Sequence, residues 1–181
     1  MTDYFAFLRG INVGGKNSIK MQDLRQLFAD CGCSNVKSYI QSGNLIFQYK
    51  KANPEGLRKK LEAKIMQNIG NTIPVVLRTR EELDNIVKLD PFKNAPIKAN
   101  SKFYIVFLSE KPALNIELPM ISEKDGLNVL SVINDNAFVL SFEIKGRNGF
   151  PNNFIEKKLG VAATSRYWNT VLKMMELDPK T

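Results

Sequence analysis

The chain has 181 residues, 44% of them hydrophobic, and a formal net charge of +8. It contains no histidine, which excludes Ser-His-Asp and Cys-His catalysis and imidazole metal ligation. Cys31 and Cys33 are too few for a structural zinc site and too close in sequence for an unstrained disulfide, so we expect free thiols. No segment approaches the roughly 20 apolar residues of a membrane span, and no signal peptide is visible. We therefore expect a cytoplasmic protein with no membrane partner, no metal and no cofactor.

The positive charge lies in one half of the chain. Residues 1–80 contain 13 Lys and Arg against 5 Asp and Glu, whereas residues 81–181 contain 13 against 13. The excess indicates an anionic partner or substrate for the first half. A solvated basic surface that aids solubility is the alternative explanation.

The first half is predicted to contain six elements, in the order strand, helix, strand, strand, helix, strand. The strands are expected at residues 4–9, 36–41, 44–49 and 73–78, and the helices at 21–31 and 54–69. Apolar residues recur at helical spacing in both helices, and Gly32 and Gly70 follow them as C-terminal caps. This order is the split βαβ, or ferredoxin-like, unit.

The second half is less regular. Thr79 and Glu82 form a capping box that opens a short helix ending before Pro91, and a loop-like segment over 91–101 follows. Further elements are expected in chain order: a strand at 103–108, a hairpin of 127–133 and 137–144, a helix at 151–159, and a last helix capped by Thr164 or Ser165. We expect an α+β fold of two ferredoxin-like halves packed together, residues 1–90 and an imperfect second half at 91–181.

The segment LRGINVGGKN, which follows the first strand, contains the spacing of a phosphate-binding loop. Gly10, Gly15 and Lys16 give G-x-x-x-x-G-K, but Asn17 occupies the place of the Ser or Thr that holds Mg²⁺. The strand at 73–78 ends in basic residues rather than in the acid that would assist the metal, and the predicted sheet is not parallel. The loop therefore does not predict a nucleoside triphosphatase.

The same loop keeps two properties of an anion site. Its glycines can adopt positive φ, and it leads to the N-terminus of a helix, where free N–H groups favour anions. In a ferredoxin-like unit the end of the first strand lies beside the turn joining the second and third strands, so RGINVGGKN should meet QSGN. The predicted anion-binding residues of these two loops are Arg9, Asn12, Gly14, Gly15, Lys16, Asn17, Gln41, Ser42 and Asn44. A tight strand-to-helix connection without a ligand is the alternative.

Three segments of the chain resemble the domain of unknown function family 1697, a family of bacterial proteins. They are Leu8–Asn17, Tyr39–Asn44 and a C-terminal segment similar to ATxRNWxTVxKL, from which the chain departs at Tyr167. The resemblance runs over nearly the whole chain. It implies an α+β fold of two ferredoxin-like halves and no established activity.

The C-terminal segment adds two candidate residues. Thr164 and Arg166 are expected at a helix N-terminus, where a hydroxyl, free amides and a guanidinium can bind a phosphate or carboxylate. The alternative is that Thr164 or Ser165 is only the N-cap of this helix and binds no ligand. Trp168 falls on the apolar side of the predicted helix and is expected in the core.

Three functions remain open at this stage. The first is binding of a small anionic ligand at the glycine loop, without catalysis. The second is binding of a nucleic-acid backbone by the basic helix at 54–69. Base stacking of the kind found in RNA-recognition modules is not expected, because the positions of the stacking aromatic residues are Asn44 and Ile46 here. The third is an enzyme acting on a phosphorylated or carboxylated small molecule, with Lys16, a carboxylate such as Asp3 or Glu143, or a tyrosine as acid or base, or Ser42 with Lys16 as nucleophile and base.

Overall fold

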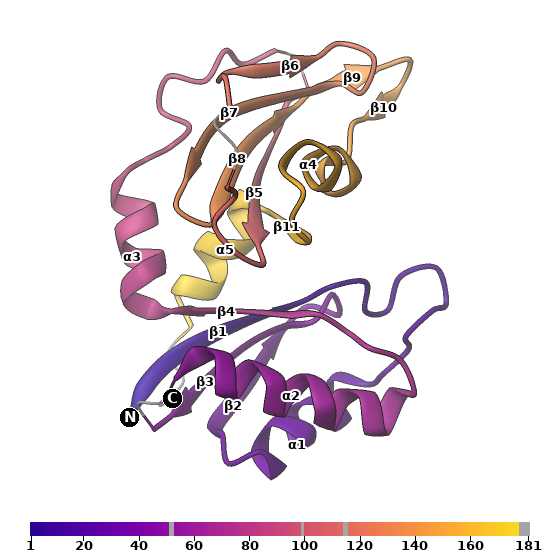
Figure 1. The fold of residues 1–181 in the computed structure, drawn as a ribbon, viewed down its shortest axis with the longest axis vertical. Coiled ribbons are helices and arrows are strands. Elements are labelled where there is room, and N and C mark those ends of the chain that lie inside the picture. The colour runs from indigo at the N-terminus through magenta and orange to yellow at the C-terminus, as the bar shows by residue number, and fades with distance from the viewer. Residues whose placement is uncertain (51–52, 99, 114–115, 178–181) are drawn as a thin grey trace. The chain divides into compact units, whose positions relative to one another are not determined.

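The computed structural model describes residues 1–50, 53–98, 100–113 and 116–177 (Figure 1). By compactness the chain divides into two units, one of Met1–Asn85 with Met174–Thr181 and the other of Ile86–Lys173. Each unit combines an antiparallel sheet with helices, so the predicted α+β class is confirmed. The chain passes from one unit to the other at residue 85, five residues before the boundary expected from the sequence, and returns at residue 174.

The first unit contains the six elements predicted for it. These are β1 (Thr2–Leu8), α1 (Met21–Asp30), β2 (Ser34–Tyr39), β3 (Asn44–Tyr49), α2 (Pro54–Ile69) and β4 (Val75–Thr79). The strands form an antiparallel sheet in the order β2-β3-β1-β4. The predicted neighbours of β3, which are β1 and β2, are therefore confirmed, and this pairing brings the end of β1 beside the β2–β3 turn.

Helices α1 and α2 cover one face of this sheet (Figure 1). Their apolar residues lie three and four positions apart, which places them on one side of each helix. The residues that α1 and α2 contribute to the core are Leu24, Leu27, Phe28, Leu57, Leu61 and Ile65. They pack against alternate residues of the strands, among them Ala6 of β1 and Phe47 of β3.

Local chemistry fixes both ends of α2. The Asn53 side chain accepts a hydrogen bond from the Glu55 amide at 2.9 Å, and Pro54 occupies the first turn. Gly70 ends the helix in the left-handed conformation, with φ of 81°. These are the helix limits that the sequence predicts.

Helix α3 (Arg80–Lys88) begins with the predicted capping box. The Thr79 amide and hydroxyl both donate to Glu82 Oε2, at 2.6 and 2.8 Å, and the Glu82 amide donates to Thr79 Oγ1 at 3.2 Å. Within the first unit, the Arg80 guanidinium donates to the carbonyl oxygens of Met175 and Leu177, at 3.0 and 2.8 Å. These two hydrogen bonds fasten the end of the described chain to the unit that contains its beginning.

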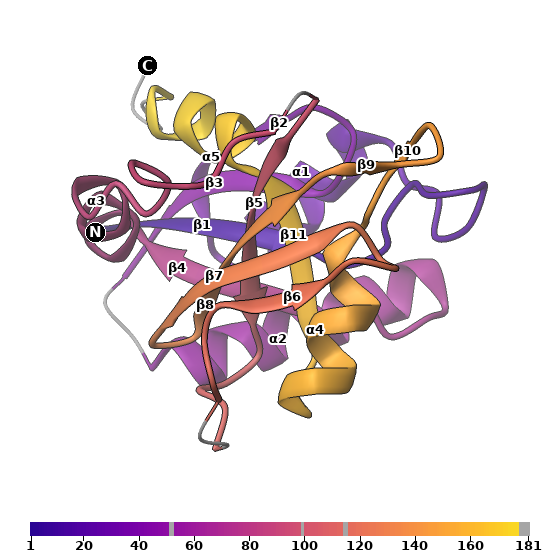
Figure 2. The ribbon, with the colours of Figure 1, turned by 90° about the horizontal axis from the view of Figure 1, so that it is seen from above.

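The second unit contains a five-stranded antiparallel sheet in the order β11-β5-β8-β7-β6 (Figure 2). The strands are β5 (Lys102–Leu108), β6 (Met120–Ser122), β7 (Leu127–Ile133), β8 (Asn136–Ser141) and β11 (Ala163–Tyr167). Helix α4 (Pro151–Leu159) packs Ile155 and Leu159 into the core of this unit, and α5 (Trp168–Met175) follows β11 directly. A short ribbon of β9 (Glu143–Ile144) and β10 (Arg147–Asn148) lies between β8 and α4 in the chain.

The order of these elements differs from that of the first unit. The β7–β8 hairpin is confirmed, with Asn134 at its turn in the left-handed region at φ of 55°. The described residues between β5 and β6 form no helix, and Pro112 and Pro119 in this segment disfavour one. The second unit is therefore α+β, but it does not repeat the six-element order of the first, strand, helix, strand, strand, helix, strand.

The predicted start of the last helix is wrong. Thr164, Ser165 and Arg166 are extended and lie in β11, opposite Phe107, Val106 and Ile105 of β5, and α5 begins only at Trp168. A Thr or Ser before an apolar helical stripe favours an N-cap locally. Here that preference is outweighed by the backbone hydrogen bonds of the ladder and by burial of the strand at the edge of the sheet.

Candidate functional site

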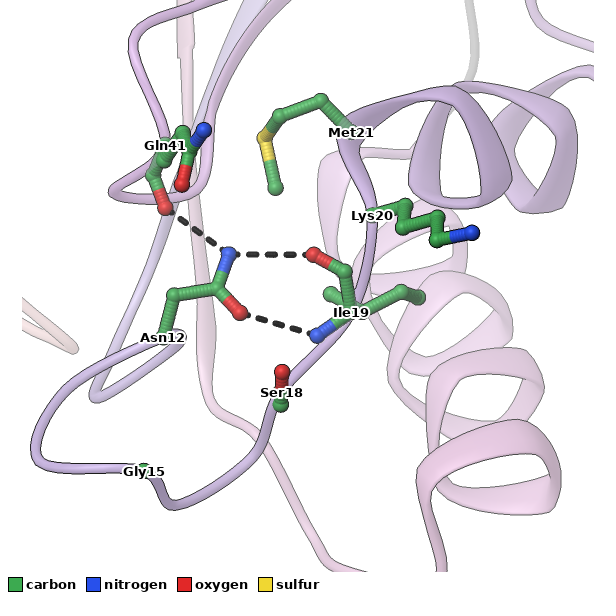
Figure 3. Close-up of a pocket in the computed structure, with 7 residues that line it drawn as sticks. All are labelled: Asn12, Gly15, Ser18, Ile19, Lys20, Met21 and Gln41. Atoms are coloured by element: carbon green, nitrogen blue, oxygen red, sulfur yellow. Dashed lines mark hydrogen bonds between the residues drawn. The ribbon is translucent and has the colours of Figure 1, made fainter.

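A pocket of about 410 Å³ opens in the first unit beside the beginning of α1 (Figure 3). The segment between β1 and α1 forms most of its wall, the first residue of α1 adds Met21, and the β2–β3 turn adds Gln41. The lining residues are Asn12, Gly15, Ser18, Ile19, Lys20, Met21 and Gln41.

The glycine loop is a narrow hairpin. The backbone amide of Asn12 donates to the backbone carbonyl of Asn17 at 3.3 Å, and the backbone amide of Lys16 donates to the Val13 carbonyl at 3.0 Å. Gly14 and Gly15 lie between these pairs with φ of 58° and 74°. Positive φ at both central residues is the geometry of a type I′ turn, which explains the glycine pair. The spacing that resembles a phosphate-binding loop thus belongs to a hairpin turn.

The Asn12 side chain joins three segments of the pocket wall (Figure 3). Its Nδ2 donates to the carbonyl oxygens of Ile19 and Gln41, at 3.0 and 2.9 Å, and its Oδ1 accepts from the Ile19 amide at 2.8 Å. Both hydrogens of the amide group are thereby used. Asn12 therefore holds the wall together, and its donors are not available to a ligand in this arrangement.

The two predicted loops do meet. The Leu8 amide donates to the Gly43 carbonyl at 2.9 Å, in addition to the bond between Asn12 and Gln41. Gly43 has φ of 72°, and a Cβ there would lie 2.8 Å from both Leu8 Cβ and Ile11 Cγ2. The turn therefore needs glycine for its backbone conformation and for its close approach to the first loop.

Asn17 and Asn44 support the two loops from within. The Asn17 side chain donates to the Gly10 carbonyl at 3.0 Å and accepts from Asn71 Nδ2 at 3.1 Å. This cross-loop bond gives a structural reason for an amide where a phosphate-binding loop has a hydroxyl. Asn44 is fully buried, and its Nδ2 donates to the Tyr39 carbonyl at 3.2 Å and to Ser42 Oγ at 2.8 Å.

The positive side of the pocket is the start of α1. Lys20 is the N-cap residue, with extended backbone and no side-chain hydrogen bond to the helix. The first amides of α1 therefore have no side-chain cap, and the helix dipole adds positive potential there. Asp23 in the first turn partly offsets this potential. Neither Lys16 nor Lys20 forms an ion pair within the described part of the chain.

The predicted site residues of the two loops lie partly in the pocket wall and partly beside it. Asn12, Gly15 and Gln41 line the pocket. Arg9, Gly14, Lys16 and Asn17 lie on the same loop, Ser42 lies in the β2–β3 turn and Asn44 begins β3, and none of these six residues lines the pocket. The sequence prediction omitted Ser18, Ile19, Lys20 and Met21, which line the pocket because they lead into α1. The predicted start of α1 at Met21 was the signal that could have identified them.

Thr164 and Arg166 belong to the other unit. Because they lie in β11, the premise that placed them at a helix N-terminus is wrong. Arg166 Nη1 donates to Thr164 Oγ1 at 3.0 Å and to the Ser165 carbonyl at 2.8 Å. Arg166 is 9% exposed as a residue, and burial lowers the pKa of its guanidinium to about 10. Anion binding by these two residues stays a prediction.

The described residues contain neither a cluster suited to a metal ion nor a helix suited to spanning a membrane. No group of three or more His, Cys, Asp and Glu residues in the described ranges is arranged to hold a metal ion. None of the described helices combines the length and the hydropathy that crossing a membrane requires.

Comparison with known proteins identifies the family. Residues 1–138 match the model of a protein family described as "Protein of unknown function (DUF1697)". The chain belongs to this family. The matched part of this DUF1697 protein includes the glycine hairpin, the β2–β3 turn and the pocket between them. A search of curated proteins gives no match.

One solved structure supports the fold of the DUF1697 chain. It is a conserved bacterial protein from Streptococcus pneumoniae, with 22% sequence identity and a TM-score of 0.67, and the alignment covers 97% of each chain. At this identity the likeness concerns the fold alone.

Proposed function

We propose that the pocket at the start of α1 binds a small anion bearing a phosphate or carboxylate group. The observation that carries the proposal is the position of Lys20. It lines a pocket of about 410 Å³, and it is also the N-cap residue of a helix whose first amides lack a side-chain cap.

The composition of the wall supports binding rather than catalysis. Of the seven lining residues, Lys20 bears a cation, at the end of a side chain that extends away from Asn12 and Gln41 (Figure 3), and Ser18 bears a hydroxyl. None of the seven is a carboxylate, a thiol or a phenol. A cation, a hydroxyl and free amides are donors suited to an oxyanion. The volume suits a small metabolite, because ligand pockets measure roughly 300–1,000 Å³.

The basic face of α2 is a weaker candidate than the pocket because its cations already have partners. Arg58 forms ion pairs with Glu55 and Glu62, at 2.6 and 2.7 Å, and Lys59 pairs with Glu55 at 3.4 Å. The remaining cations, Lys60 and Lys64, contact the Cys31 carbonyl oxygen at 2.8 Å and Asp30 at 3.6 Å. Cations that already have partners neutralise fewer phosphates, so fewer counterions are released from the nucleic acid and binding is weaker.

Thermal unfolding in the presence of small anions tests the proposal. We expect inorganic phosphate, acetate or ribose 5-phosphate, added at constant ionic strength, to raise the unfolding temperature in a saturable manner. A ligand at a hundredfold excess over its dissociation constant adds about 2.7 kcal/mol to the free energy of unfolding. In the Lys20→Met variant, about tenfold more ligand should be needed for the same rise in unfolding temperature, because one charge-assisted contact contributes about 1.5 kcal/mol.

Lys50→Met is the matched control, because Lys50 is an exposed lysine of the same unit that does not line the pocket. It should respond to the anions like the unaltered protein. Equal responses of the Lys20→Met and Lys50→Met variants would refute the proposed site, and so would the absence of any saturable shift.

A further inference from the structure

A second pocket, of about 340 Å³, lies within the second unit, where β5 begins and β11 passes into α5. Its lining differs from that of the first pocket because three of seven residues are aromatic. The lining residues are Ser101, Lys102, Phe103, Tyr167, Trp168, Asn169 and Thr170.

Two of the aromatic residues are held in place by Phe92. Its ring centroid lies 4.9 Å from that of Phe103 and 5.5 Å from that of Trp168, both edge to face. Phe92 also contacts Phe138 of β8 at 5.9 Å and is 8% exposed. Edge-to-face packing fixes ring orientation, so these walls of the pocket are formed before any ligand arrives.

Tyr167 forms a third aromatic wall and remains 46% exposed. Its ring lies 4.7 Å from the ring of Tyr104, its cross-strand partner, at an interplanar angle of 31°. Burial and the contact with Tyr167 raise the pKa of Tyr104, so this phenol stays neutral. Lys102 Nζ lies 5.9 Å from the Tyr167 ring centroid and adds a cation at the same place.

The polar residues of this pocket are donors for an anion. Asn169 and Thr170 belong to the first turn of α5, which contains no acidic residue. Asn169, with a side-chain amide, Ser101 and Thr170, with hydroxyls, and Lys102, with an ammonium group, line the pocket together with the aromatic residues. Flat aromatic faces beside a cation and neutral donors suit a planar ring that carries a negative group.

We propose that this pocket binds a small planar aromatic anion, whose ring contacts the exposed ring of Tyr167 and whose carboxylate or equivalent group meets Lys102, on the face of β5 and β11 that also carries Tyr104. This second site is independent of the anion site proposed beside α1. It includes Tyr167 and Trp168 of the C-terminal sequence segment, in which Thr164 and Arg166 were the predicted anion-binding residues and Trp168 was expected in the core.

The single tryptophan of the chain makes the proposal directly measurable. Benzoate is the probe, and Trp168 fluorescence, excited where tyrosine does not absorb, is the first readout. We expect a saturable change with a dissociation constant at or below about 1 mM. Isothermal titration calorimetry under the same conditions detects binding that leaves the fluorescence unchanged.

Two ligand analogues separate the contributions of ring and charge. Benzamide keeps the ring and lacks the charge, and it should bind about tenfold more weakly. Cyclohexanecarboxylate keeps the charge and lacks the planar ring, and it should bind at least about threefold more weakly. Equal affinity of benzoate and cyclohexanecarboxylate would overturn the aromatic assignment.

Protein variants complete the test. Lys102→Met should weaken benzoate binding about tenfold, and Tyr167→Leu about three- to tenfold. Lys124→Met, at an exposed lysine of the same unit outside the pocket, should leave it unchanged. Circular dichroism verifies that each variant is folded. Unaltered binding in the Lys102→Met variant, or no saturable binding of benzoate in either readout, would overturn the proposal.

Discussion

At the scale of single residues, side-chain amides connect the loops that surround the first pocket. Asn12 and Asn17 each bond to segments on two sides of the glycine hairpin, and Asn44 bonds within the β2–β3 turn. From the sequence alone these residues suggest ligand contacts, because amides commonly bind anions. Their hydrogen bonds in the structure go instead to backbone oxygens and to neighbouring side chains, so they shape the pocket rather than fill it.

Cys33 gives a prediction at the same scale. It is 5% exposed, and burial, with Cys31 nearby, raises the pKa of its thiol from 9.0 to about 12. Above about pH 9 the unfolded chain releases this proton and the folded protein keeps it, so the free energy of unfolding falls as the pH rises towards 12. One such group gives a slope of about 1.4 kcal/mol per pH unit.

Urea unfolding from about pH 8 to about pH 10.5 measures this slope. Cys33→Ala should lose stability less steeply with pH than the unaltered protein, whatever the substitution costs at neutral pH. The remaining slope includes Cys31, Tyr4 and Tyr104, whose pKa values are also raised by burial. Parallel slopes for the two proteins would contradict the prediction.

At the scale of elements, the sequence predicts what local interactions determine. The positions of Leu24, Leu27 and Phe28 are enough to place α1, and Pro54 and Gly70 are enough to limit α2. The strand β11 depends on residues far away in the sequence, because Thr164 lies opposite Phe107. A pattern read along the chain does not contain that pairing, so the local capping preference of Thr164 or Ser165 led to the wrong element.

The pocket, too, could be predicted from the sequence only in part. The meeting of the two loops was predictable, because it follows from the strand order of the first unit. The lining by Ser18, Ile19 and Met21 was not predicted, because no special residue type distinguishes them and only their place at the predicted start of α1 indicates it. Their position depends on how the Gly14-Gly15 turn directs the chain back towards α1.

The β2–β3 turn provides a prediction about glycine. We expect Gly43→Ala to lower the free energy of unfolding by about 2–4 kcal/mol, because positive φ disfavours a Cβ and overpacking adds its own cost. The added Cβ would lie 2.8 Å from Leu8 and Ile11. Urea unfolding at neutral pH measures the loss.

Gly70→Ala is the control for backbone strain alone. Gly70 has φ of 81°, but a Cβ there would meet no atom within 4 Å. This variant should lose only about 1 kcal/mol. If both alanine variants lost the same stability, close approach of the two loops would not be the reason for Gly43.

At the scale of the whole molecule, the net charge of +8 gives a prediction about nucleic acids. The cations of α2 are partnered, so we expect a short DNA duplex to show no saturable binding in the micromolar range at near-physiological salt. Fluorescence anisotropy with a labelled duplex measures this.

The informative variant changes three lysines of α2 together, Lys59→Gln, Lys60→Gln and Lys64→Gln. It should behave like the unaltered protein in the anisotropy measurement. Tight, salt-sensitive binding that these three substitutions abolish would instead support the nucleic-acid alternative.

The hydrogen bonds from Arg80 to Met175 and Leu177 have a consequence for synthesis of the chain on the ribosome. Residues 1–85 of the first unit are translated before the second unit, but the first unit also contains residues 174–177. Arg80 therefore acquires these two acceptors only after the entire second unit has been translated. The unit that begins first is completed last.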